Sequence, residues 1–136
     1  MLEIVRVKEQ KDVAPRWLTR NGQLALLRAI RQGENERDLA IIQMMLGAGL
    51  RISEVARLKV SDIDLNDRSG WVYVRTGKGM KPRSIPLSIH VRKVLQAHLK
   101  MRSYTIDDDL FLDQRGPLSE WGFHAIVKKY VYQARL

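Results

Sequence analysis

An almost uninterrupted run of apolar residues, LAIIQMML at 39–46, lies between Asn35 and Gly49. A segment of this kind, which lacks a polar stripe, predicts a helix from about Asn35 to Ala48 that is buried on most sides. Gly49 is expected to end that helix in the left-handed conformation, which glycine adopts without steric strain. A chain of 136 residues fits a single domain that can bury a core around such a helix.

The other predicted helices begin at residues that favour helix N-caps. Thr19 precedes a helix at about 20–32, Ser53 a short one to about 58, Ser88 one to about 101, and Ser119 one that runs toward the C-terminus. Residues 1–16 show no sustained helical period and are expected to be a linker or lead-in segment. Apolar side chains at helical spacing should form the inward faces of the first and last of these helices: Leu24, Leu26, Leu27, Ile30, Phe123, Ile126, Val127 and Tyr130.

Three short segments, at 62–65, 71–75 and 83–87, are expected to be strands. The last two flank a glycine-rich turn and therefore predict an antiparallel hairpin with Lys78 near its tip. Pro86 favours an edge position because proline has no N–H group to donate to a neighbouring strand. The predicted fold class is α+β, mostly α-helical with a small antiparallel three-stranded sheet.

The positive charge of the chain is concentrated in one segment. The formal net charge is +9, and residues 68–106 contain nine Lys or Arg residues and no Asp or Glu. Such a segment favours a polyanionic partner, with nucleic acid as the first candidate and a solvated basic surface as the alternative. The absence of cysteine excludes disulfides and thiolate zinc sites, and no segment has the length of a membrane span or the features of a signal peptide. We therefore expect a cytoplasmic protein.

Two motifs carry most of the functional information: GLRISEV at 49–55 and the basic turn GKGMKPR at 77–83. Together with DIDL at 62–65 and LSEWGFHAIVKKY at 118–130, they resemble the catalytic domain of tyrosine recombinases (phage integrases). The resemblance covers about residues 17–134 and implies the fold of DNA breaking-rejoining enzymes. In that family a tyrosine attacks a DNA phosphodiester, forms a 3′-phosphotyrosyl link and releases a 5′-hydroxyl, without a metal or a nucleotide cofactor.

The resemblance implies a catalytic role for three residues. Arg51 would hold oxygens of the scissile phosphate through paired hydrogen bonds, which suits a guanidinium, although a cation after a helix end also complements the helix dipole. Lys78 would protonate the leaving 5′-oxygen, and its alternative is a solvated lysine in a turn. Glu54 would orient the Arg51 guanidinium, or else only stabilise the first turn of its own helix.

The predicted hairpin carries further basic residues that we expect to contact DNA: Arg75, Lys81 and Arg83. Removing a contact to a DNA phosphate should weaken affinity for all sequences and reduce its salt dependence. The implied partner is double-stranded DNA, on which the parent protein would assemble as a tetramer.

Three other patterns do not hold. The series Asp62, Asp64 and Asn66 begins like a calcium loop, but Asp67 stands where the loop needs glycine. The three histidines lack metal-ligand spacing. The segment at 46–58 could imitate a helix-turn-helix, but its candidate recognition helix is very short and carries Val55 and Leu58 where exposed base-reading residues are needed. We therefore predict no metal site and no cofactor.

The family pattern should continue with His-x-x-Arg, then His or Trp, then the nucleophilic tyrosine, and none of these occurs before Leu136. We therefore interpret residues 17–136 as a truncated tyrosine recombinase catalytic domain, a monomer that binds DNA but does not cleave it. The alternative is a non-catalytic DNA-binding or regulatory module that uses the basic hairpin for backbone contacts alone. An RNA-binding hairpin protein is a third possibility, because Trp71 and Tyr73 share one face of a strand.

Overall fold

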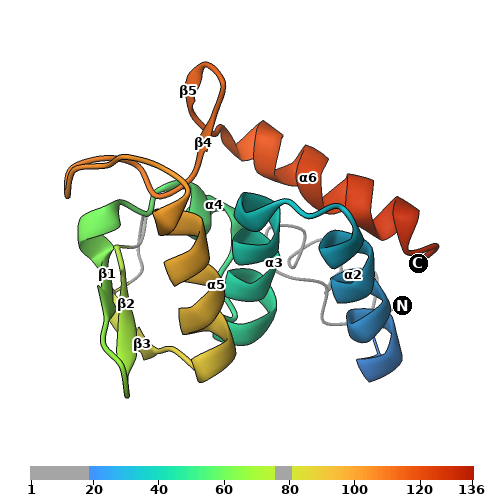
Figure 1. Cartoon of the computed structure of the whole chain (residues 1–136), viewed down its shortest axis with the longest axis horizontal. Coiled ribbons are helices and arrows are strands. Elements are labelled where there is room, and N and C mark those ends of the chain that lie inside the picture. The colour runs from blue at the N-terminus through green and yellow to red at the C-terminus, as the bar shows by residue number, and fades with distance from the viewer. Residues whose placement is uncertain (1–18, 76–80) are drawn as a thin grey trace.

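A computed structural model describes residues 19–75 and 81–136, which form a mostly helical structure with two small antiparallel sheets (Figure 1). The α+β class predicted from the sequence is confirmed. The elements in chain order are α2 (Arg20–Gln32), α3 (Glu36–Ala48), α4 (Ile52–Ala56), the 3₁₀-helix η1 (Val60–Asp62), β1 (Ile63–Leu65), β2 (Gly70–Val74), β3 (Arg83–Pro86), α5 (Ile89–Lys100), β4 (Leu112–Asp113), β5 (Gly116–Pro117) and α6 (Glu120–Gln133).

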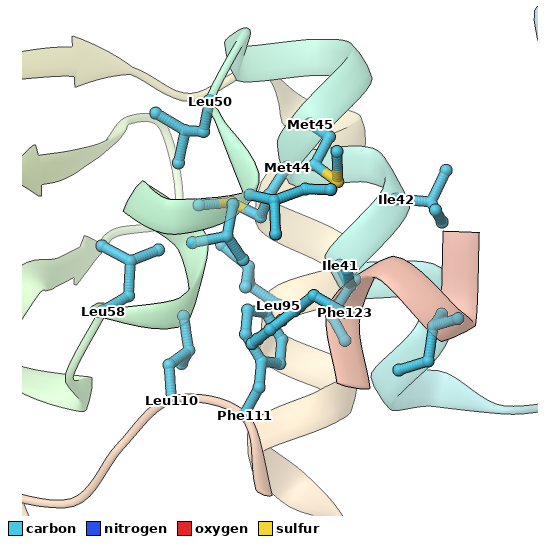
Figure 2. Packing of buried hydrophobic residues seen from close by; sticks show 14 of the residues in the cluster. Ile41, Ile42, Met44, Met45, Leu50, Leu58, Leu95, Leu110, Phe111 and Phe123 are labelled. Carbon is cyan, nitrogen blue, oxygen red and sulfur yellow. The ribbon is translucent and has the colours of Figure 1, made fainter. Parts of the chain in front are cut away.

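Helix α3 lies at the centre of the molecule, between α5 and α2, as its apolar sequence predicted (Figure 1). Its N-cap is Asn35, whose side chain accepts a 3.0 Å hydrogen bond from the Asp38 N–H group. Gly49 ends the helix with a φ of 70°, the predicted left-handed conformation. Figure 2 shows how residues of α3 pack against α5, α6 and the loop before β4: Ile41, Met44, Leu95, Leu110, Phe111 and Phe123.

Helix α2 has the predicted bounds, and the Thr19 side chain caps it by accepting a 3.0 Å hydrogen bond from the Gly22 N–H group. Leu26 and Ile30 are buried, but the inward position predicted for Leu24 is wrong, because that side chain is 45% exposed. The reason is geometric: at 100° per residue, position 24 lies about 200° around the helix from position 26. The neighbouring helices α3 and α6 cover the opposite side of α2.

The three-stranded sheet has the order β1-β2-β3, which confirms that the strand containing Pro86 is an edge strand. In the β2–β3 pair, Trp71 lies opposite Pro86 and Val74 lies opposite Arg83. Val72 and Val74 point into the core, whereas the alternate side chains of β2 point to solvent. The sheet therefore presents one buried and one exposed face, and it lies at the opposite end of the molecule from α2 (Figure 1).

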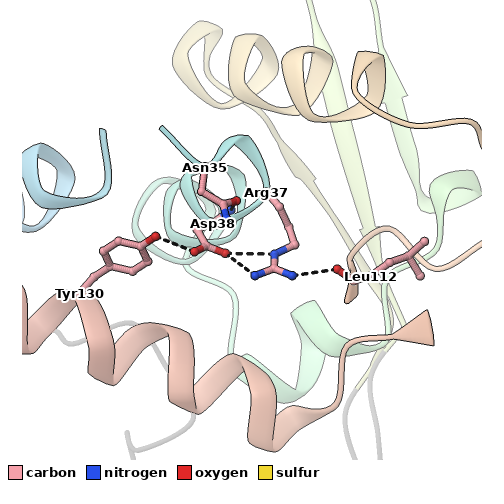
Figure 3. A network of polar contacts seen from close by, with 5 residues as sticks. All are labelled: Asn35, Arg37, Asp38, Leu112 and Tyr130. Atoms are coloured by element: carbon pink, nitrogen blue, oxygen red, sulfur yellow. Dashed lines mark hydrogen bonds and ion pairs between the residues drawn. The ribbon is translucent and has the colours of Figure 1, made fainter. Parts of the chain in front are cut away.

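Helix α6 packs across α2 and α4 and is joined to α3 by a buried polar network (Figure 3). The Tyr130 hydroxyl donates to the Asp38 carboxylate, which also accepts from Arg37, and the Arg37 guanidinium donates to the carbonyl oxygen of Leu112 at the start of β4. Phe123, Ile126 and Tyr130 point inward as predicted, and Val127 is partly buried. The network thus connects the last helix, the central helix and the small β4–β5 hairpin.

Candidate functional site

Arg51 occupies the turn between the central helix α3 and the short helix α4. Its backbone is extended, with φ −77° and ψ 155°, and it is the N-cap residue of α4. The N-cap predicted at Ser53 is therefore wrong by two residues, because Ile52 already has helical geometry. The Arg51 side chain is exposed. The residue therefore caps a helix through its backbone and is itself exposed.

Glu54 holds the backbone of this turn. Its carboxylate Oε1 accepts a 2.9 Å hydrogen bond from the Arg51 N–H group, the contact that a third-position acid commonly makes to an N-cap residue. Glu54 is only 7% exposed. We expected its carboxylate to orient the Arg51 guanidinium, but the hydrogen bond it makes to Arg51 is to the main chain.

The carboxylate of Glu54 is also paired with Arg83, the first residue of β3. Arg83 Nη1 lies 2.7 Å from Oε2, and Nη2 lies 3.1 Å from Oε1, so the pair is bidentate. Burial alone would raise the pKa of Glu54, but the hydrogen bonds from Arg83 and from the Arg51 N–H group, with the charges of both arginines, lower that pKa below its ordinary value of 4.5. The same pair raises the pKa of Arg83. Glu54 is therefore ionised at neutral pH.

A second arginine–carboxylate pair lies at the end of β2. Arg75 Nη2 donates to Asp62 Oδ2 at 2.9 Å and to the carbonyl oxygen of Arg57 at 3.1 Å. The same oxygen of Asp62 accepts a 2.9 Å hydrogen bond from the Lys59 N–H group. Thus Arg51 with Glu54 and Lys59 with Asp62 follow one pattern, in which an acid holds the backbone of a basic residue three positions earlier. Our sequence reasoning missed Asp62, although this spacing was visible.

Of the two remaining basic residues of the predicted site, the structure describes Lys81 but not Lys78. Lys81 is exposed and lies two residues before β3. Lys78 lies outside the described residues, as does the predicted lead-in segment at 1–16. The structure therefore brings Arg51, Glu54 and Arg83 together. It places Arg75 beside the turn that contains Arg57. It gives no position for Lys78, the predicted proton donor.

Three cavities that are lined by described residues lie near the start of α3, away from Arg51. A cavity of about 430 Å³ is lined by residues from the start of α3, the end of α5 and β4, including Arg37, His98 and Arg102. Arg51 follows the other end of α3, a helix of 13 residues that spans ~20 Å. Within 19–75 and 81–136, no cluster of three His, Asp or Glu side chains could hold a metal ion, and no helix is long and apolar enough to cross a membrane. The candidate site therefore consists of the exposed Arg51 and its neighbours Glu54 and Arg83.

An arginine in a turn after a central buried helix, with two further arginines at the ends of paired strands of a small antiparallel sheet, fits the tyrosine recombinase fold that the sequence motifs predicted. The comparisons with known proteins agree. Residues 16–136 match the family model described as "Phage integrase family", and the chain belongs to this family of tyrosine recombinases.

Curated relatives are tyrosine recombinases from archaea and bacteria. Tyrosine recombinase XerA of Thermococcus kodakarensis is 37% identical over 123 residues, which is 88% of this chain and 43% of the relative. Tyrosine recombinase XerC of Pelotomaculum thermopropionicum is 34% identical over an alignment 148 residues long, which covers 100% of this chain and 47% of the relative. The chain therefore spans less than half the length of these relatives.

Two solved structures have a similar fold. The crystal structure of XerA recombinase aligns with a TM-score of 0.75 and 26% identity, over 89% of this chain and 43% of that one. The structure of XerH site-specific recombinase, bound to its difH substrate in a pre-cleavage complex, aligns with a TM-score of 0.73 and 25% identity, over 91% of this chain and 38% of that one. The fold predicted from the two motifs is the fold of recombinase catalytic domains.

Proposed function

We propose that the protein to which this chain belongs is a site-specific DNA recombinase that cuts and rejoins DNA in the cytoplasm through a 3′-phosphotyrosyl intermediate. In this reaction a tyrosine oxygen forms a bond to phosphorus while the bond from phosphorus to the 5′-oxygen breaks. The phenol loses one proton and the 5′-oxygen gains one. The protein must therefore accept the proton of the phenol, provide a proton to the 5′-oxygen and place positive charge beside the phosphate.

Arg51 is proposed to bind the scissile phosphate. The observation that carries this role is that Arg51 is exposed while its backbone N–H group is hydrogen-bonded to the buried Glu54 carboxylate. A guanidinium on a fixed backbone can offer two parallel hydrogen bonds to phosphate oxygens. Arginines that stabilise phosphoryl transfer in other enzymes are worth ~10³ to 10⁵ in rate. Membership of the phage integrase family supports the same assignment.

Lys78 is proposed to give a proton to the leaving 5′-oxygen, because an ammonium group is a labile donor and an alkoxide is a poor leaving group. Lys81, which is exposed, is proposed to contact the DNA backbone near the cleavage point. Arg75 is proposed to contribute to the same positive surface, although its guanidinium is also paired with Asp62. Arg75 and Lys81 are proposed to extend the DNA contact from the Arg51 turn to the ends of β2 and β3.

Alone, the 136-residue chain is proposed to bind duplex DNA as a monomer without forming a covalent link. None of its described tyrosines is proposed as the nucleophile. The parent is proposed to assemble as a tetramer on DNA. Light scattering of the free chain should give the mass of one copy, and a dimer would contradict the monomer proposal.

The test uses a labelled DNA duplex and its affinity for the chain as a function of salt. Arg51→Gln and Lys81→Gln should each weaken binding and reduce the slope of log K against log salt by ~0.9, the value expected for one phosphate contact. Arg28→Gln is the matched control, because Arg28 is an exposed arginine on α2, at the other end of the molecule from the sheet. Equal effects of all three substitutions would mean that only net charge matters, which contradicts the proposed site.

A nicked suicide duplex tests the covalent step. The chain should form no adduct that survives denaturation, whereas a longer protein that contains the downstream tyrosine should form one. An adduct formed by the 136-residue chain would contradict the proposed division of the active site. Continued binding without any adduct from the longer protein would favour the non-catalytic DNA-binding module.

The exposed aromatic residues of β2 favour a second candidate, an RNA-binding surface. Trp71 is 46% exposed and Tyr73 is 43% exposed, and they lie on the same face of the strand. Single-stranded RNA is often bound by stacking on such side chains. Competition decides between the two: an unlabelled RNA strand that displaces the duplex at a lower concentration than unlabelled duplex does would favour RNA.

A further inference from the structure

The guanidinium of Arg83 is turned toward the protein rather than toward solvent. Two of its nitrogens donate to the two oxygens of Glu54, at 2.7 and 3.1 Å. The Glu54 side chain is 7% exposed and the Arg83 side chain 38% exposed. A bidentate arginine–carboxylate pair fixes the relative orientation of both side chains, since the two hydrogen bonds are parallel. Arg83 is therefore held in one orientation by a largely buried partner.

One oxygen of Glu54 serves two partners. Oε1 accepts from Arg83 Nη2 at 3.1 Å and from the Arg51 backbone N–H group at 2.9 Å. The side chain of Arg83 and the main chain of Arg51 are thus linked through a single atom. They belong to different parts of the fold, because Arg83 begins β3 and Arg51 precedes α4.

We propose that Arg83 is a positioning residue, which acts through the Glu54 carboxylate to hold the Arg51 turn against the β2–β3 hairpin, and that it is not a phosphate contact. The proposal rests on the proposed function of Arg51 as the phosphate-binding arginine. It reassigns Arg83, which the sequence alone placed among the DNA contacts. The catalytic group remains Arg51, and Arg83 acts only through its neighbour.

The energetics favour this role over a phosphate contact. If Arg83 swung out to a DNA phosphate, it would leave the Glu54 carboxylate buried without its charged partner, which is costly. Lys81 has no such constraint, because it is exposed and no described acid pairs with it. The two neighbouring cations of the hairpin therefore take different roles.

The register of the sheet connects the Arg83–Glu54 pair to the core. Arg83 lies opposite Val74 in the β2–β3 pair, and Val74 is fully buried. The strand that carries Arg83 is held by its pairing with β2, by Ile85, which packs partly buried against the core, and at its first residue by Glu54. Through Glu54 this rigid strand supports the backbone of Arg51, whose own side chain stays exposed.

A double-mutant cycle on duplex affinity tests the proposal in the full chain. Arg83→Met should weaken binding, and its effect should disappear when Arg51 is already Gln, because Arg83 acts through Arg51. We expect a coupling of at least about threefold in affinity, as for residues in one hydrogen-bonded network. Lys81→Gln, the control, should weaken binding by the same factor in both backgrounds. If Arg83→Met instead weakens binding by the same factor with and without Arg51→Gln, and lowers the salt slope by ~0.9, Arg83 is a phosphate contact and the proposal is wrong.

Amide hydrogen exchange of Arg51 gives a second readout that needs no DNA. Arg83→Met should speed exchange of this amide at least about threefold relative to amides in the middle of α3, because its acceptor Glu54 loses its anchor. Arg83→Lys keeps one charged donor and should have a smaller effect. The control is Arg75→Met, which removes an arginine–carboxylate pair from the same hairpin without touching Glu54. Unchanged exchange in Arg83→Met would overturn the proposal.

The two measurements separate the failure of this inference from the failure of the proposed function. If the chain binds no duplex, or if Arg51→Gln leaves the affinity unchanged, the proposed function fails, and the exchange rates still decide whether Arg83 positions Arg51. If Arg51→Gln weakens binding but coupling and faster exchange are both absent, only the positioning role fails. Should Arg83→Met not fold, Arg83→Lys takes its place in both experiments.

Discussion

The Tyr130 hydroxyl donates a 2.6 Å hydrogen bond to Oδ2 of Asp38, and this bond joins the last helix to the first turn of the central helix (Figure 3). Asp38 is 1% exposed, and its other oxygen accepts from Arg37 Nε at 3.0 Å and from Nη2 at 2.9 Å. The carboxylate thus has a charged partner on one oxygen and a neutral donor on the other.

Tyr130→Phe should lower the free energy of unfolding by about 1–3 kcal/mol, because it leaves a buried carboxylate oxygen without its donor. Urea unfolding at neutral pH, followed by circular dichroism, measures this change. Tyr132→Phe is the control, since Tyr132 lies on the same helix but is 85% exposed. Equal stability of the two variants would mean that the bond to Asp38 contributes nothing.

The same contact argues against Tyr130 as a nucleophile. Burial first, and then the hydrogen bond to the negative Asp38, raise the pKa of the Tyr130 phenol well above its usual value of 10.0. A phenol that is buried and bound to a carboxylate keeps its proton. We therefore expect Tyr130→Phe, in a longer protein with the downstream tyrosine, to leave the yield of covalent adduct unchanged once the variant is folded. Loss of the adduct in folded protein would identify Tyr130 as the reacting group.

His98 should make the chain less stable as the pH falls below about 6.5. Its Nε2 lies 2.8 Å from the carbonyl oxygen of Leu110 and must carry the hydrogen of that bond, because a carbonyl only accepts. Burial lowers the pKa of His98 below its ordinary 6.5, outweighing the Leu110 hydrogen bond, and the nearby Arg102 adds to the lowering. The unfolded chain therefore takes up a proton at a higher pH than the folded chain, so stability falls from about pH 6.5 down to the folded pKa.

The check is the slope of unfolding free energy against pH. In His98→Gln the side-chain amide can still donate to Leu110 but cannot take up a proton, so the part of the slope that begins below pH 6.5 should disappear. The exposed His90 is the control, and His90→Gln should keep the wild-type slope. An unchanged slope in His98→Gln would show that His98 titrates alike in both states.

Glu54 should give a second loss of stability at lower pH. Its pKa in the folded chain lies below 4.5, so below about pH 4.5 the unfolded chain binds a proton that the folded chain resists. The stabilising contribution is complete above that pH and is lost as the pH falls through the folded pKa. Arg83→Met should weaken this pH dependence, because Arg83 supplies the strongest of the effects that lower the pKa. A wild-type profile in Arg83→Met would mean that the pair does not persist in solution.

Local signals account for the parts of the structure that the sequence predicted. The bounds of α2 could be predicted because Thr19 and Gly33 mark its two ends. The three-stranded sheet could be predicted because its short strand segments are separated by turn residues. The contact between Glu54 and Arg51 is also local, spanning three residues, although its hydrogen bond to the main chain rather than to the guanidinium was not foreseen. The pair of Glu54 with Arg83 could not be read, because it joins positions 29 residues apart. That pairing depends on how the sheet docks beside α4.

The β4–β5 hairpin could not be predicted from the sequence either. Each of its strands has two residues, Leu112–Asp113 and Gly116–Pro117. Two residues are too few to show the alternation that identifies a strand. What fixes the hairpin is a tertiary contact, the hydrogen bond from Arg37 to the Leu112 carbonyl oxygen.

Gly49 should contribute to DNA binding as well as to stability. Its φ is 70°, and a Cβ atom built there would meet no atom within 4 Å, so any cost of substitution comes from the backbone alone. Gly49→Ala should lower the free energy of unfolding by ~1–2 kcal/mol, and Gly49→Asn by less, because asparagine visits the left-handed region more readily.

The position of Gly49, two residues before Arg51, separates a general loss of stability from a local effect. Gly116→Ala is the matched control: its φ is 132°, a Cβ there also meets no atom, and it lies in the β4–β5 hairpin. Both alanine variants should be less stable, but only Gly49→Ala should bind duplex DNA more weakly under conditions where both are folded, because relief of its strain displaces the Arg51 turn. If the two variants bind DNA equally well, the geometry of this turn does not control the contact of Arg51 with DNA.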